Sequence, residues 1–169
     1  AEPFAPTFRP TVDGSAVEMV IITSTDQVSE YQRLADYKNQ TGITTVVRDI
    51  DWIRANYRVG VDLQETIRNF IRDAVQKWGT TYVVLGGDND IIPARYGFTK
   101  YYGSENIPTD LYYTDVDGNW NGDGDGVFGE GYYDGSDQGD GVDLYPDVWV
   151  SRFPTNTLAE ASDMVDKTL

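Results

Sequence analysis

Short, nearly continuous apolar runs alternate along the chain with longer stretches in which apolar residues recur at helical spacing. The runs cover Val17–Thr23, Ile43–Val47 and Tyr82–Leu85. Such runs are typical of strands buried on both faces of a parallel sheet. Two further short strands are predicted over Leu111–Thr114 and Asp147–Val150.

Capping boxes indicate where three of the helical stretches begin. The pairs are Ser24 with Gln27, Asp62 with Glu65, and Thr157 with Glu160. The helix after Asp62 has the strongest apolar stripe, formed by Leu63, Ile67, Phe70, Ile71, Ala74 and Trp78. We interpret this stripe as core packing. A shorter helical turn is predicted over Ile50–Tyr57.

The alternation of strands and helices predicts an α/β fold. Right-handed βαβ units place helices on both faces of a mainly parallel sheet, as a three-layer αβα sandwich. We expect an extended, proline-punctuated arm over residues 1–18 and a single α/β subdomain over residues 19–169.

Ligands of such sheets gather at the carboxyl ends of the strands. Residues 24–26, 86–90 and 151–154 fall there. Asp88 and Asp90 could bind a metal or a substrate cation, but we favour a turn in which they accept from backbone amides.

The segment from Asp115 to Glu130 reads DVDGNWNGDGDGVFGE, with oxygen-bearing side chains at alternate positions and glycines between most of them. From Asn119 onward it matches the EF-hand loop pattern, except that Asn replaces the first Asp. Calcium takes roughly six to eight oxygen ligands, and glycines let a short loop turn them toward one point. We therefore predict a calcium site with the ligands Asp115, Asp117, Asn119, Asn121, Asp123, Asp125 and Glu130.

The segments that flank this loop carry no helical periodicity, so the loop is EF-hand-like without the flanking helices. The alternative is an acidic loop that is merely solvated, but the interleaved Trp120, Val127 and Phe128 are uncommon in disordered segments. A second acidic series could supply another site or fold back onto the first. It consists of Asp134, Asp137, Asp140 and Asp143.

The charged residues are unevenly distributed within a formal net charge of −15. Twelve acidic residues and no Lys or Arg lie between Tyr101 and Ser151, whereas the rest of the chain has sixteen acidic and thirteen basic residues. Nucleic acids and anionic membranes are therefore poor partners. No segment approaches the roughly 20 apolar residues of a membrane span, and no signal peptide is recognisable. The chain has no Cys and no His, which excludes thiol nucleophiles and histidine bases within it.

Four stretches of the sequence, taken together, resemble the gingipain family of cysteine peptidases. In order from Met19 they are MVIITSTDQVSEYQRLADYKNQTGITTVVRDID, TYVVLGGDNDIIPARY, TDLYYTDVDGNWNGDGDG and PDVWVSRFP. In the last stretch Ser151 replaces the glycine of the family's usual V-G-R. The part of the family that matches is the amino-terminal subdomain of the catalytic domain.

The resemblance implies a caspase-like, flavodoxin-like half domain that binds calcium. In this family the catalytic Cys and His belong to a second subdomain, so no catalytic residue can be transferred to this chain. We expect the chain to be the first half of a peptidase domain, truncated near residue 169 and inactive alone. The implied partners are the missing carboxy-terminal subdomain and, for the full-length enzyme, polypeptide substrates. We also expect a secreted or cell-surface protein, since weak calcium modules are typical of extracellular proteins.

Two other functions stay open at this point. A stand-alone calcium-dependent recognition or adhesion module would share the fold without peptidase activity, and a downstream Cys and His in a longer gene would decide between the two. A sugar-nucleotide transferase would use Asp115-Val-Asp117 as a DxD motif with a divalent metal. That third function rests on one short motif and would require tight binding of a nucleotide sugar.

Overall fold

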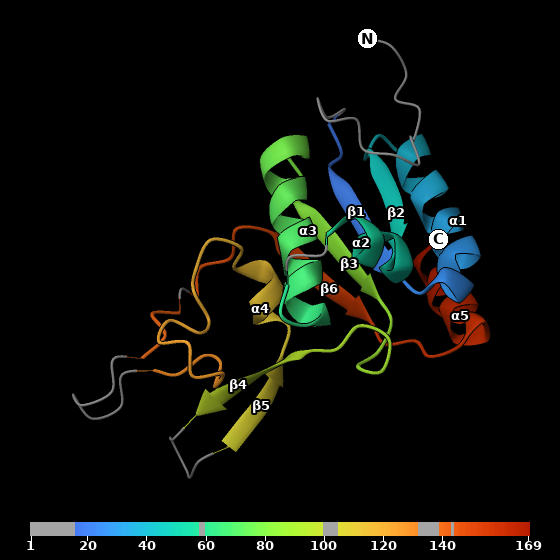
Figure 1. The fold of residues 1–169 in the computed structure, drawn as a ribbon. Helices are drawn as coiled ribbons and strands as arrows, with labels where there is room; N and C mark the ends of the chain where they lie inside the picture. Colours follow the sequence, from blue (N-terminus) through green and yellow to red (C-terminus); the bar gives the residue numbers. More distant parts are fainter. Residues whose placement is uncertain (1–15, 58–59, 100–104, 132–138, 143) are drawn as a thin grey trace. The chain divides into compact units, whose positions relative to one another are not determined.

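The structure is a computed structural model that describes residues 16–57, 60–99, 105–131, 139–142 and 144–169. These residues form two compact units (Figure 1). The first unit comprises the described residues up to Pro93 together with Val148–Leu169, and the second comprises Ala94–Asp147. Most of the predicted amino-terminal arm lies outside the described residues, and the division of the chain at residues 18 and 19 stays a prediction.

The first unit contains a four-stranded parallel sheet in the order β2-β1-β3-β6. Its strands are β1 (Met19–Thr23), β2 (Thr45–Asp49), β3 (Tyr82–Gly86) and β6 (Trp149–Phe153). Ile21 in β1 pairs with Val47 on one side and with Val84 on the other. The chain therefore crosses from one side of β1 to the other between β2 and β3. The prediction of an α/β fold with a mainly parallel sheet is confirmed.

Two helices cover one face of this sheet, α1 (Val28–Gln40) and α5 (Leu158–Thr168) (Figure 1). Their apolar faces and the sheet form one buried cluster. Its members are Ile21, Tyr31, Leu34, Ala35, Val47, Val84, Ala161 and Val165.

The helices α2 (Ile50–Asn56) and α3 (Leu63–Trp78) cover the opposite face. Trp52 of α2 packs edge to face on Phe70 of α3, with ring centroids 5.9 Å apart. The guanidinium carbon of the buried Arg48 lies 4.9 Å from the centre of the Trp52 ring. Helices thus lie on both faces of the sheet, and the three-layer sandwich is confirmed.

The predicted capping boxes form to different extents. At α5 the box is complete, because Thr157 accepts from Glu160 N and the Glu160 carboxylate accepts from Thr157 N. At α3, Asp62 accepts from Glu65 N at 2.8 Å, but the Glu65 carboxylate accepts from the amide of Val61. The helix α3 therefore forms only one of the two hydrogen bonds of its predicted capping box.

The predicted box at Ser24 does not form. Ser24 makes no capping hydrogen bond through its side chain, and a short 3-10 helix, η1 (Thr25–Gln27), precedes α1. Gln27 is buried and accepts from the hydroxyl of Thr155 at 2.8 Å, so its side chain is directed into the core instead of back to Ser24. Tyr31 lies 2.9 Å from the same hydroxyl and completes a buried polar network.

Strand β2 begins two residues later than predicted. The side chain of Asn39 accepts from Thr45 N at 2.8 Å and donates to Thr45 O at 3.0 Å, which occupies the backbone at the start of the strand. At the other end Asp49 accepts from Trp52 N at 2.8 Å and caps α2, so the predicted helical turn is confirmed.

The second unit contains an antiparallel pair, β4 (Arg95–Thr99) and β5 (Glu105–Thr109), followed by the short helix α4 (Leu111–Thr114). The predicted strand over Leu111–Thr114 is therefore wrong. Tyr112 and Tyr113 are both buried, whereas neighbouring residues of a strand would point to opposite faces. The helical turn lets both rings pack inward.

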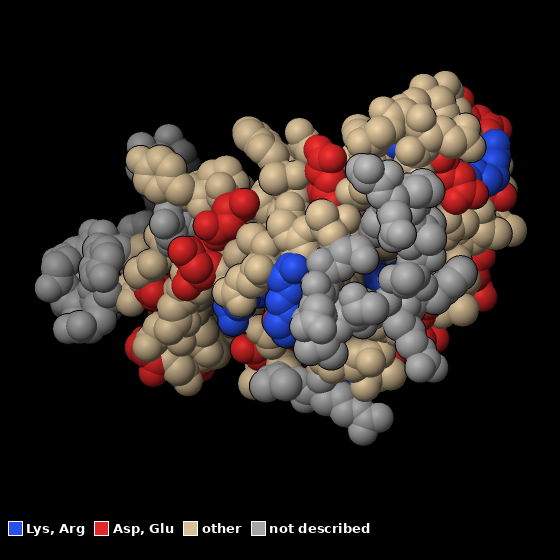
Figure 2. Space-filling view, turned by 90° about the horizontal axis from the view of Figure 1, so that it is seen from above, with Lys and Arg blue, Asp and Glu red and all other residues tan. Residues whose placement is uncertain are grey.

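Figure 2 shows acidic side chains spread over one face of the molecule, with a few basic side chains between them. In the part of the chain that the structure describes, no helix combines the length and the apolar character that crossing a membrane requires.

Candidate metal centre in the acidic loop

The acidic loop has an aromatic core of its own. Tyr112 packs edge to face on Trp120 and on Phe128, with ring centroids 5.5 and 6.3 Å apart. The guanidinium carbon of Arg95 lies 3.8 Å from the centre of the Phe128 ring. Gly129 N donates to Trp120 O at 2.9 Å, which closes the loop on itself. The interleaved aromatic residues therefore belong to an ordered loop.

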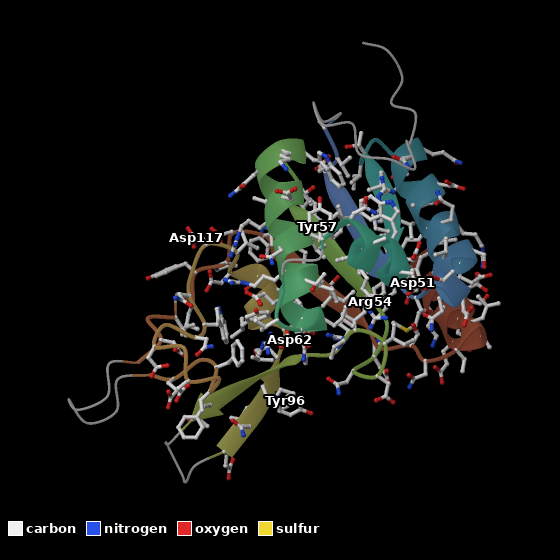
Figure 3. The ribbon with its side chains drawn as sticks, viewed as in Figure 1. Asp51, Arg54, Tyr57, Asp62, Tyr96 and Asp117 are labelled. Carbon is white, nitrogen blue, oxygen red and sulfur yellow. The ribbon has the colours of Figure 1, made fainter. Side chains whose placement is uncertain are left out.

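Three carboxylates form a first acidic group at the start of the loop, namely Asp115, Asp117 and Asp147. Each offers an oxygen within 4.8 Å of the others. Asp115 is only 1% exposed, whereas Asp117, which is labelled in Figure 3, and Asp147 are exposed. Asp147 accepts from Val116 N at 2.8 Å and so ties the two ends of the acidic segment together.

The buried carboxylate of Asp115 also shapes the backbone around it. One of its oxygens accepts from Gly118 N and the other from the Trp120 indole nitrogen, both at 2.7 Å. A Cβ atom on Gly118 would lie 2.7 Å from Asp115 Oδ1, so the close approach requires glycine. Asp115 thus connects the first acidic group to the aromatic core.

Asp123, Asp125 and Glu130 form a second acidic group, again with oxygens within 4.8 Å of one another. Each aspartate turns back onto its own loop, because Asp125 N donates to Asp123 Oδ1 at 3.1 Å and Val127 N donates to Asp125 Oδ1 at 2.7 Å. Gly124 lies between them with φ at 78°, a left-handed conformation that favours glycine. The loop is therefore curled tightly enough to bring three carboxylates together.

The second acidic series folds back onto the first at Asp140. Its buried carboxylate accepts from Gly122 N at 2.6 Å and from Glu130 N at 2.9 Å. These bonds hold the carboxyl-terminal half of the loop against the amino-terminal half. The other members of that series lie outside the described residues, namely Asp134, Asp137 and Asp143.

The structure thus places five of the seven predicted ligands in two groups, Asp115 and Asp117 in the first and Asp123, Asp125 and Glu130 in the second. Asn119 and Asn121 direct their side-chain oxygens to backbone amides, at 3.1 Å from Asn121 N and Gly126 N respectively. Asp147 was not among the predicted ligands, because it lies well beyond the end of the loop in the sequence and outside the EF-hand-like motif. The full ligand set stays a prediction.

The donor set fits a hard cation such as calcium. Both groups offer carboxylate oxygens, which calcium prefers. Two oxygens that bind one calcium ion at roughly 2.3–2.6 Å can lie at most about 5 Å apart, and both groups meet this limit. Either group could therefore contribute three carboxylates to one ion.

The turn expected after β3 is confirmed for Asp88, whose carboxylate accepts from a backbone amide. Asp88 accepts from Asp90 N at 2.9 Å and from the side chain of Asn156. Arg152 of β6 donates to the carbonyl oxygens of Gly87 and Ile92, at 2.7 and 2.8 Å, and thereby fixes the same turn.

Comparisons with known proteins agree with the fold. The model of peptidase family C25 matches residues 13–169. A solved structure described as a protease has a TM-score of 0.60 and 21% identity, with 89% of this chain and 27% of that chain covered. The complex of the pro- and mature domains of RgpB from Porphyromonas gingivalis has a TM-score of 0.62 and 24% identity, with 89% and 28% covered.

A third similar structure is the dimeric latent PorU of the same organism, with a TM-score of 0.62, 19% identity, and 89% and 15% of the two chains covered. This chain therefore spans less than a third of each of these three structures. No curated protein matches the sequence.

The family match extends over nearly the whole chain, and the fold agrees with the structures of this group. The chain therefore belongs to peptidase family C25, the gingipain family that its motifs resemble, and has the fold of that family's amino-terminal subdomain.

Proposed function

We propose that this chain is the calcium-binding, non-catalytic half of a cysteine endopeptidase domain. One observation carries the proposal: the match to a peptidase family runs over residues 13–169 of a chain that contains neither Cys nor His. A cysteine peptidase needs a thiolate nucleophile and a base that activates it. Both must come from a second subdomain, with which this half would form the complete enzyme.

The proposed role of calcium is structural. A bound ion would neutralise carboxylates that otherwise repel one another across less than 4.8 Å. Asp123, Asp125 and Glu130 would hold one ion, and Asp115, Asp117 and Asp147 would hold another. Asp115 and Asp140 would transmit the ordering to the loop backbone through the hydrogen bonds that they accept.

Peptide hydrolysis separates this proposal from a binding module that lacks activity. We expect no cleavage of fluorogenic peptides by the 169-residue chain, with or without calcium. The full-length protein should cleave them and should lose this activity after alkylation of its thiols. Cleavage by the 169-residue chain alone would contradict the proposal, as would a full reading frame with no Cys and no His.

Thermal unfolding tests the calcium part. At a calcium concentration a hundred times the dissociation constant, a single site stabilises the fold by about 2.7 kcal/mol, which raises the melting temperature by roughly 5–10 °C for a chain of this size. Asp123→Asn should reduce this response. Asp163→Asn on α5 removes the same charge from an exposed site outside the loop and serves as the matched control. Equal melting curves in calcium and in chelator would refute calcium binding.

We also propose a secreted or cell-surface location. The oxygens of the second acidic group are largely exposed, as suits a weak site that millimolar extracellular calcium fills. Detection of the native protein in culture supernatant or on intact cells is the expected result. Retention in the cytosolic fraction alone would contradict this location.

A further inference from the structure

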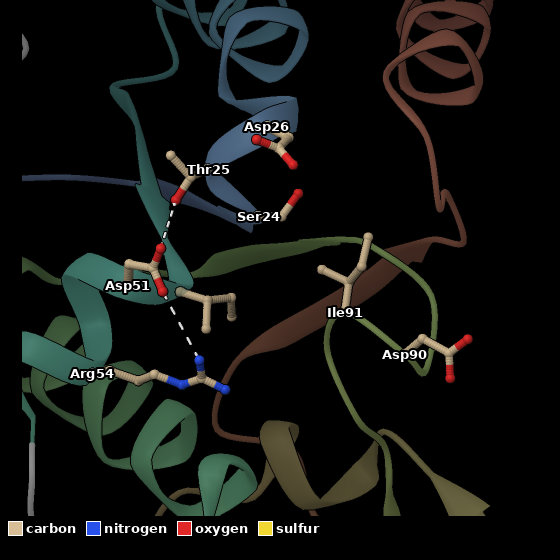
Figure 4. A pocket seen from close by; sticks show the side chains of 8 residues that line it. Ser24, Thr25, Asp26, Asp51, Arg54, Asp90 and Ile91 are labelled. Carbon is tan, nitrogen blue, oxygen red and sulfur yellow. Dashed lines mark hydrogen bonds and ion pairs between the residues drawn. The ribbon is translucent and has the colours of Figure 1, made fainter.

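A cavity of about 300 Å³ lies in the first unit, at the carboxyl edge of the parallel sheet (Figure 4). Its walls come from the segments that follow three strands, with Ser24–Asp26 after β1, Ile50–Arg54 after β2 and Asp90–Ile91 after β3. Because the chain changes sides at β1, the cavity lies at the topological switch point. Open α/β sheets bind their ligands at this point.

The walls of the cavity are held by hydrogen bonds that do not involve a ligand. Thr25 donates to the Asp51 carboxylate at 3.1 Å, which joins the first two walls. The third wall is part of the Asp88 turn, and Asp88 N donates to Thr155 O at 3.2 Å. Thr155 also belongs to the buried network with Gln27. The cavity is therefore formed before any ligand enters.

Carboxylates outnumber cations around the cavity by three to one. Asp51 forms an ion pair with Arg54 at 3.9 Å. Asp26 and Asp90 form no ion pair with a basic side chain in the described part of the chain. Two negative charges are thus available to a ligand. Figure 4 shows Ser24 beside Asp26 on one wall and the aliphatic side chain of Ile91 on another.

The geometry favours an organic cation over a metal ion. The oxygens of Asp26, Asp51 and Asp90 are not among the described carboxylate groups that converge within 4.8 Å, so these three cannot hold one ion together. The cavity volume lies at the lower end of the range of roughly 300–1,000 Å³ for small-molecule sites. A short aliphatic chain with a terminal charge fits this size.

We propose that this cavity binds a primary alkylammonium group, from a free amine or from a lysine side chain. The ammonium donates to the Asp26 carboxylate and to the Ser24 hydroxyl, and Asp90 adds attraction through its charge. The alkyl stem lies against Ile91. This site is independent of the proposed peptidase and calcium functions, because it uses no residue of either acidic group and no catalytic residue.

An NMR titration of the 169-residue chain with pentylamine tests the proposal. We expect saturable shifts of the amides of Ser24, Asp26 and Ile91, and no such shifts with pentanol, the neutral analogue. Asp26→Asn should weaken binding by roughly two- to fivefold, the upper part of the range for one exposed ion pair. Asp163→Asn on α5 removes the same charge elsewhere and should leave the affinity unchanged, and equal melting temperatures show that both variants are folded.

A peptide with one internal lysine and blocked ends identifies the source of the amine. If the peptide displaces pentylamine, the cavity accepts lysine side chains of polypeptides. If pentylamine binds and the peptide does not, the cavity accepts free amines. Three results would overturn the proposal: equal shifts with pentanol, equal weakening by the two Asn variants, or shifts confined to residues outside the cavity.

Discussion

Replacement of Asp115 by Asn tests how the acidic loop is held together. The carboxylate is 1% exposed and accepts from Gly118 N and Trp120 Nε1, both at 2.7 Å. The Asn amide has one oxygen and one NH2 group, so one of these N–H groups would face another donor. Loss of a hydrogen bond to a charged acceptor costs roughly 1.5–3 kcal/mol, and buried donors left without an acceptor cost about 1–3 kcal/mol more. We therefore expect Asp115→Asn to destabilise the loop by roughly 3–5 kcal/mol.

Hydrogen exchange at the Trp120 indole N–H, followed by NMR with chelator present, measures this effect locally. Asp115→Asn should accelerate the exchange by roughly two to four orders of magnitude, because each ~1.4 kcal/mol corresponds to a factor of ten. Asp117→Asn changes the same charge at an exposed position two residues away, so its effect should stay within about 0.5 kcal/mol. Equal exchange rates in the two variants would refute the role of Asp115.

Two further predictions concern the first unit. Gly86→Ala would place a Cβ atom 2.5 Å from the Tyr31 ring, so we expect a loss of about 1–3 kcal/mol in urea unfolding; an unchanged midpoint would contradict this packing. Burial and the neighbouring Asp73 carboxylate raise the pKa of Tyr57, which is labelled in Figure 3, from 10.0 to about 12. The unfolded chain therefore loses this proton first, and stability should fall as the pH rises from about 10 to about 12. Tyr57→Phe should remove this part of the pH dependence in a melting series, and an unchanged slope would show that other groups cause it.

The layers of the fold could be predicted because strands buried on both faces of a parallel sheet read as continuous apolar runs. Local boundaries were less predictable where side chains from other segments intervene. Asn39 bonds the backbone of Thr45 and delays the start of β2. A strand was predicted over Leu111–Thr114, but the segment forms the helix α4, in which Tyr112 packs against Trp120 and Phe128.

The sequence was enough to predict that the candidate site is a tightly turning loop. It was not enough to predict which side chains come together in each acidic group. Alternating oxygen side chains and glycines indicated a tightly curled acidic segment, which the structure has. The same side chains also accept from nearby amides, as Asn119 and Asp123 do, and this competition depends on the folded backbone. Asp147 joins the first group only because its side chain bonds Val116 N from a distant part of the sequence.

A crystal structure of the 169-residue chain grown in saturating calcium, with the ions located by anomalous scattering, tests the proposed calcium sites directly. We expect an ion at roughly 2.3–2.6 Å from carboxylate oxygens of Asp123, Asp125 and Glu130, and a second ion in the group around Asp115. A structure from crystals in saturating calcium that holds no ion at either group would contradict calcium binding by this loop.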